Sequence, residues 1–168
     1  GMHAENLRHL QLSGGEKLAG SILPWKDADV EALAKGCPRL AQLRLEHGAE
    51  SPISGAYISD FHQLTDLSLA HLGSSRLSRR ALLPLWQQQQ TRVEVAQLTR
   101  LDLSGCALDD GGVLGDLLAG CIGLQHLELA DVRCEAFPPD VFHEIRCTGL
   151  LHFGVSGTAI DSAGVILM

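Results

Sequence analysis

A six-residue pattern of leucines, Leu-x-x-Leu-x-Leu or a close variant, recurs six times in this 168-residue chain. The copies start at residues 7, 40, 64, 98, 124 and 150, so that the starts lie 33, 24, 34, 26 and 26 residues apart. They are Leu7/Leu10/Leu12, Leu40/Leu43/Leu45, Leu64/Leu67/Leu69, Leu98/Leu101/Leu103, Leu124/Leu127/Leu129 and Leu150/Phe153/Val155. Such recurrence predicts an array of similar units, each of which buries its apolar face against the next.

The fourth copy shows what one unit contains. Alternation of outward and inward side chains over 100–104 predicts a short strand, and Ser104-Gly105 turns the chain. Asp109 or Asp110 can then accept hydrogen bonds at the start of a helix that ends before Gly120. The helix is indicated by apolar residues at helical spacing, Val113, Leu114, Leu117 and Leu118. Each unit is therefore predicted to be strand, turn, helix and turn.

The stacked units predict an α/β leucine-rich-repeat solenoid, a curved right-handed superhelix. Helices are wider than the spacing of about 4.8 Å between strands, so parallel strands should line a concave face, and helices and irregular turns a convex face. We expect residues 1–168 to form a single leucine-rich-repeat domain of about six units, a fragment of a longer array. The strands are expected near residues 9–13, 42–46, 66–70, 100–104, 126–130 and 152–156.

The other units differ locally. A helix is predicted from Asp27 to Lys35, and a short one from Phe137 through Glu144. The glycines, proline and serines of 48–61 predict an irregular stretch or a helical turn. Two long units carry insertions: one spans about 15–25, and the other holds residues 74–76 and a glutamine run, 87–90, before an additional strand at 92–95.

The segment D-A-D-V-E-A-L-A-K-G-C-P-R-L-A-Q-L-R-L, from Asp27 to Leu45, resembles the cysteine-containing leucine-rich repeat of F-box and related proteins. The pattern repeats at 120–129 and more loosely at 147–155. At the ninth position of the units, where that family has a second cysteine, only Cys106 is found. The resemblance implies the substrate-recognition segment of an F-box-type ubiquitin-ligase adaptor, whose other parts would need residues beyond these 168.

Composition narrows the classes of partner. The net charge of −7 disfavours binding to nucleic acid, and no apolar run reaches the length of about 20 residues that crosses a membrane. Five cysteines without a Cys-x-x-Cys pair favour buried thiols over a zinc site, and free thiols indicate an intracellular protein of cytoplasm or nucleus. We predict no enzyme activity, cofactor or metal, because the known catalytic loop motifs are lacking.

The outward side chains of the predicted strands are the candidate protein-binding site, and we expect solvent or a partner to reach them. Asp102 should lie beside Glu128, and Arg44 near Asp66 and Ser68. The complete set of concave-face candidates is Gln42, Arg44, Glu46, His47, Asp66, Ser68, His71, Arg100, Asp102, His126, Glu128 and His152.

Three further features leave alternatives open. His47 with His71, and His126 with His152, occupy matching positions in neighbouring units, which we interpret as ladder pairs and not as metal sites. Trp25 is either an interface anchor on the first insertion or part of the core. Because neither end of the array is polar in the way of a terminal unit, a homodimer through an uncapped end is a secondary expectation.

The function predicted from sequence is protein–protein interaction by an adaptor segment. A ribonuclease-inhibitor-like or NLR-like regulatory repeat array is the first alternative. The second alternative is a structural scaffold whose concave face has no ligand. The sequence does not identify the partner.

Overall fold

The computed structural model describes residues 4–13, 25–46, 52–72, 76–91, 97–134 and 149–158. The described chain is α/β, as predicted, and its main sheet has six parallel strands in the order β1-β2-β3-β5-β7-β8. These strands are β1 (His9–Ser13), β2 (Gln42–Glu46), β3 (Asp66–Ser68), β5 (Arg100–Asp102), β7 (His126–Glu128) and β8 (His152–Gly154). Every leucine hexad thus supplies one strand, and neighbours in sequence are neighbours in the sheet.

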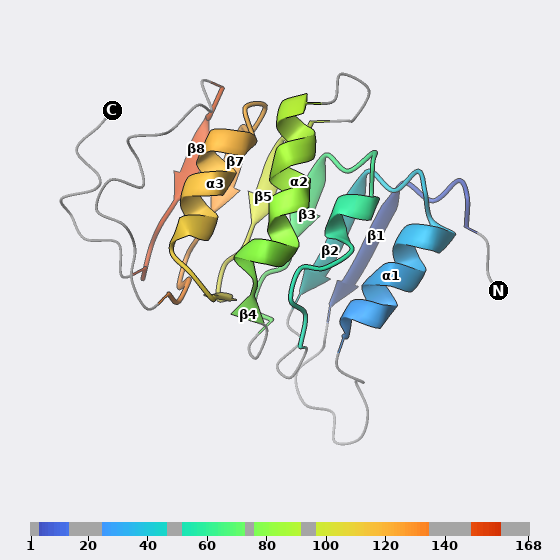
Figure 1. Ribbon diagram of the computed structural model, residues 1–168, viewed down its shortest axis with the longest axis horizontal. Coiled ribbons are helices and arrows are strands. Elements are labelled where there is room, and N and C mark those ends of the chain that lie inside the picture. The colour runs from blue at the N-terminus through green and yellow to red at the C-terminus, as the bar shows by residue number, and fades with distance from the viewer. Residues whose placement is uncertain are drawn as a thin grey trace.

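Helices lie on one side of this sheet, in front of it in Figure 1. They are α1 (Asp27–Gly36), the 3-10 helix η1 (Ile58–Asp60), α2 (Arg79–Thr91) and α3 (Gly112–Gly120). A second, two-stranded parallel sheet joins β4 (Arg76–Leu77) to β6 (Ala107–Leu108), and a bridge from Ala107 to Arg133 continues it. This small sheet, which the sequence did not predict, links the turns that lead from the strands into the helices.

The strands pair in equal register, so each inward leucine lies beside its equivalent. Leu43, Leu67, Leu101 and Leu127 form one such row, and all four are 0% exposed. The helices close this core with Val30 of α1, residues Leu82, Leu85 and Trp86 of α2, and the apolar face of α3. Burying one large apolar side chain contributes about 1.5–3 kcal/mol to the free energy of folding. This row of leucines therefore stabilises the sheet.

Backbone hydrogen bonds repeat in the same way from unit to unit. The carbonyl oxygen of Ala41 accepts the N–H groups of both Thr65 and Asp66, and the carbonyl of Thr65 accepts those of Thr99 and Arg100. The same double acceptance occurs at the carbonyls of Arg8, Thr99 and Gln125. Each strand of the main sheet after β1 therefore starts from a fixed contact with the residue that precedes the neighbouring strand.

Four strands are shorter than predicted, because a left-handed turn follows them. His71, Gly105, Asp131 and Gly157 occupy equivalent positions and have φ angles of 57°, 70°, 56° and 69°. Backbone pairing still continues beyond the assigned strands, for example from the N–H of Leu69 to the carbonyl of Asp102. The expected ranges 66–70, 100–104, 126–130 and 152–156 therefore overestimate the regular strand by two residues each.

The helices agree with the sequence except at α2. The predictions at 27–35 and around 113–118 are confirmed by α1 and α3, and the helical turn expected within 48–61 is η1. The glutamine run lies in the last part of α2, which also contains Pro84, and a helix of this length was not predicted. The helix expected from Phe137 and the additional strand at 92–95 lie outside the described residues.

The described cysteines that occupy repeat positions are part of the core. Cys37, Cys106 and Cys121 are 5%, 0% and 0% exposed. The thiol of Cys106 lies 2.8 Å from the carbonyl oxygen of Leu69, and burial raises its pKa to about 12. Such a thiol stays protonated and unreactive at neutral pH. Cys147, predicted to be buried as well, lies outside the described residues.

Helix α3 comes close to the backbone of α2 at Gly120. A Cβ atom at this position would lie 2.9 Å from the Cβ and 3.1 Å from the carbonyl oxygen of Trp86. Since the carbonyl belongs to the backbone of α2, it cannot move without the helix. The absence of a side chain at Gly120 is therefore what allows the two helices to pack.

We expect Gly120→Ala to destabilise the fold by about 1–3 kcal/mol, because of overpacking against α2. The expected direction is informative, since alanine normally favours a helix over glycine by roughly 0.8–1 kcal/mol. Urea unfolding would measure the change. Gly112→Ala is the comparison. It should destabilise the fold less than Gly120→Ala, because its Cβ would meet the flexible end of the Arg79 side chain. An equal loss in both variants would contradict the backbone contact.

Candidate binding surface

The face of the sheet opposite the helices carries two rows of polar side chains. The first row follows the register His9, Gln42, Asp66, Arg100, His126 and His152. The second row follows Gln11, Arg44, Ser68, Asp102, Glu128 and Gly154. With Ser13 and Glu46 at the ends of β1 and β2, these residues are the polar face. The predicted neighbours Asp102 and Glu128 pair directly in register.

Arg44 and Asp66 form an ion pair across β2 and β3. The Nη2 atom of Arg44 lies 2.8 Å from Oδ2 of Asp66. The hydroxyl of Ser68 donates to the carboxylate of Glu46 at 3.0 Å. Both contacts join a residue of β2 to the β3 residue two positions before its register partner. The hydrogen bond that Arg44 donates to Asp66 raises the pKa of Arg44, and the charges of Asp66, Glu46 and Asp102 raise it further.

The centre of the polar face is less accessible than predicted. Asp66 is only 8% exposed and Ser68 only 3%. The prediction that solvent reaches these side chains is therefore wrong. They are shorter than the Arg44 and Glu46 side chains that hydrogen-bond to them from β2, and they lie on an inner strand with neighbours on both sides.

The histidine pair at the other end of the face is confirmed. The rings of His126 and His152 are stacked with their centroids 6.0 Å apart. His152 also contacts Glu128, with 2.5 Å between Nε2 and Oε1. A Cβ atom at Gly154 would overlap the Glu128 carboxylate, so the glycine provides the space in which that carboxylate lies.

The remaining candidates lie at the margins of this surface. His71 is exposed and sits on the left-handed turn, where its ring packs against Gly105 of the next unit. His47 and the first histidine ladder pair lie outside the described residues. Trp25 is partly buried and packs against the hydrophobic core, as the core alternative predicted. Ile22, Leu23 and Pro24 of the same insertion lie outside the described residues.

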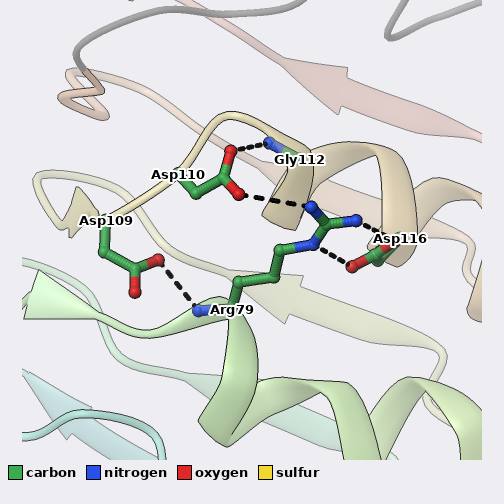
Figure 2. A network of polar contacts seen from close by, with 5 residues as sticks. All are labelled: Arg79, Asp109, Asp110, Gly112 and Asp116. Carbon is green, nitrogen blue, oxygen red and sulfur yellow. Dashed lines mark hydrogen bonds and ion pairs between the residues drawn. The ribbon is translucent and has the colours of Figure 1, made fainter.

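A separate polar network joins α2 to α3 on the helical side of the sheet (Figure 2). The guanidinium of Arg79 donates twice to Asp116, at 2.7 and 3.1 Å, and once to Asp110, at 3.2 Å. The Asp109 carboxylate accepts the backbone N–H of Arg79 at the first residue of α2. Asp110 accepts the N–H of Gly112 at the start of α3, as predicted.

This network perturbs two of its charged groups. The hydrogen bonds and charge of Asp116, followed by those of Asp110, raise the pKa of Arg79. The hydrogen bond from the N–H of Gly112, followed by that from Arg79, lowers the pKa of Asp110. Both shifts show that the contacts stabilise the charged forms of Arg79 and Asp110. Sequence reasoning missed the network because Arg79 is 37 residues from Asp116, and no local pattern connects them.

Two searches of the described residues bear on function. They contain no group of three or more histidine, cysteine, aspartate or glutamate side chains arranged to hold a metal ion. In the same parts of the chain, no helix is long and apolar enough to span a membrane. Comparison with models of known protein families gave no match, and comparison with curated proteins gave no significant match.

We expect Arg44→Met to destabilise the protein by about 1–3 kcal/mol. The substitution removes a charged hydrogen-bond donor from a carboxylate that is largely withdrawn from water. Thermal or urea unfolding would measure the loss. Arg100→Met on the same face is the matched control, because Arg100 is exposed, and should stay within about 0.5 kcal/mol of the parent. Equal stability of both variants would contradict a structural role for the ion pair.

Asp110→Ala should destabilise the protein above about pH 4 and progressively less below it. Because the folded pKa of Asp110 is lowered, its contribution is present above the unfolded pKa and is lost as the pH falls through the folded pKa. Urea unfolding of parent and variant across this range would measure the difference. Asp110→Asn keeps an acceptor for the N–H of Gly112 and should lose less stability than Asp110→Ala. A pH-independent difference for Asp110→Ala would contradict the assignment.

Proposed function

We propose that this chain is a leucine-rich-repeat segment that recognises another protein through the polar face of its sheet. The observation that carries the proposal is the pair of polar rows, which run in register across six parallel strands on the face opposite the described helices. Each strand contributes one outward residue to each row, and most neighbouring residues in a row differ in chemistry. A surface of this kind offers a partner many independent polar contacts with defined spacing.

The proposed architecture is a curved right-handed solenoid with the polar face on its concave side. Helices α2 and α3 need more room than the strands beneath them, so stacking both on one side favours curvature toward the sheet. The reduced exposure of Asp66 and Ser68 at the middle of the face supports this view. In this proposal, residues 1–168 are one domain of about six units.

The proposed role is the substrate-recognition segment of an F-box-type ubiquitin-ligase adaptor. Its support is the resemblance of 27–45 to cysteine-containing repeats, together with the burial of Cys37, Cys106 and Cys121. A ribonuclease-inhibitor-like or NLR-like array remains the alternative within binding proteins. An F-box in the same reading frame would favour the first role, and a nucleotide-binding domain would favour the second.

The proposal assigns the chain no catalytic activity, cofactor or metal. Its partner is a protein and not a nucleic acid, in keeping with the net charge of −7. The buried free thiols favour the cytoplasm or nucleus. Pairing of two copies through an end of the array stays a secondary prediction, to be measured by light scattering.

Affinity capture with a polar-face variant separates recognition from a scaffold role. The variant combines Arg100→Ala, Asp102→Ala and Glu128→Ala, which leaves the Arg44–Asp66 ion pair intact. We expect at least one captured protein to be depleted about tenfold, and the loss to recur with that protein in purified form. The matched control combines Arg80→Ala, Glu31→Ala and Asp60→Ala on the helical side, with the same change in net charge. An unchanged set of captured proteins would favour the scaffold.

A further inference from the structure

The charges of the polar face are unequal. It carries the carboxylates of Glu46, Asp66, Asp102 and Glu128, but only two guanidinium groups, Arg44 and Arg100. One guanidinium is already engaged, since Arg44 pairs with Asp66. With neutral histidines, the face is net negative. Arg100 can compensate no more than one of the remaining carboxylates, and Glu128 also contacts His152.

Two of these carboxylates stand side by side. Asp102 and Glu128 pair in register on neighbouring strands, and like charges at directly opposite positions are unfavourable. The positions that flank them in the same row are small, with Ser68 on one side and Gly154 on the other. The pair therefore lies in the row without a long side chain in register next to it.

An unpaired acceptor lies on the adjacent strand of the same face. Asp66 is 8% exposed, and its Oδ1 atom is buried without a hydrogen-bond donor among the described residues. Its other oxygen, Oδ2, accepts from Arg44. A buried carboxylate oxygen without a donor is unfavourable, and an N–H or O–H donor would satisfy it.

The negative charges of the polar face already stabilise the charged form of Arg44. The pKa of Arg44 is raised by its hydrogen bond to Asp66, and also by the charges of Glu46 and Asp102, which do not hydrogen-bond to it. Arg100 of β5 already stands in register between Asp66 and His126, so a further cation between β3 and β7 would be favoured beside Asp102 and Glu128.

We propose that strands β3, β5 and β7 form a binding site for a lysine or arginine side chain of an extended partner segment. Asp102 and Glu128 provide the counter-charge, and Asp66 provides the acceptor, once the side chains that cover its Oδ1 atom shift. The inference rests on the proposed function, because it specifies the partner of the polar face as a basic peptide segment. Complementary charge gives such an encounter its specificity and a rate that depends on salt.

Titration with two synthetic peptides tests this site. One alternates lysine and serine, and the other has glutamate at every lysine position. We expect the lysine peptide to bind, to weaken with added salt, and to perturb backbone amide resonances of β3, β5 and β7 more than those of the helices. The glutamate peptide should not bind.

Asp102→Asn combined with Glu128→Gln should weaken the lysine peptide about tenfold, which corresponds to about 1.4 kcal/mol. The control, Glu31→Gln combined with Asp60→Asn, changes the net charge equally on the helical side and should bind like the parent. An equal loss in the control would mean attraction by net charge alone and would overturn the site.

The outcomes also separate this inference from the proposed function. Binding of the glutamate peptide to β3, β5 and β7 would overturn the basic partner while keeping the polar face as a recognition surface. Absence of lysine-peptide binding would also overturn it. The proposed function would then still stand if affinity capture loses a partner in the polar-face variant, and would fall if that variant also captures an unchanged set of proteins.

Discussion

Equal register between successive strands is the constraint on which the rest of this structure depends. One carbonyl, such as that of Thr65, accepts two N–H groups of the next strand and so fixes where that strand begins. Since side chains alternate along a strand, this contact places leucine beside leucine on the helical side. It also places the outward residues in two rows. A shift by one residue would expose Leu67 and Leu101 and bury the charged side chains instead.

The helical layer is joined by more specific contacts than the sheet. Gly120 allows α3 to reach the backbone of Trp86. Arg79, the first residue of α2, binds three aspartates in and just before α3. These contacts involve neighbouring units only, as expected for an array whose stability is a sum of nearest-neighbour terms. The sheet therefore provides a uniform core, while individual residues determine how each helix sits on the next.

The sequence predicts what is periodic in this protein and misses what depends on a single contact. The hexads predicted six strands and their pairing, and apolar spacing with a terminal glycine predicted α1 and α3. Helix α2 was missed because Pro84 interrupts its helical pattern, and its stability comes from burying Leu82, Leu85 and Trp86. The low exposure of Asp66 depends on where longer neighbouring side chains lie, which no residue pattern encodes.

Exposed positions of the polar face can change without affecting the fold, because the core and the outward rows lie on opposite sides of the same strands. Arg100, which is exposed, is a position where a substitution would affect the proposed recognition and not the fold. Asp66 is different, since one carboxylate oxygen holds Arg44 and the other is buried without a donor. A substitution there changes the stability of the sheet and the chemistry offered to a partner together. In the proposed function, Asp66 is therefore the residue at which the requirements of the fold limit the partners of the polar face.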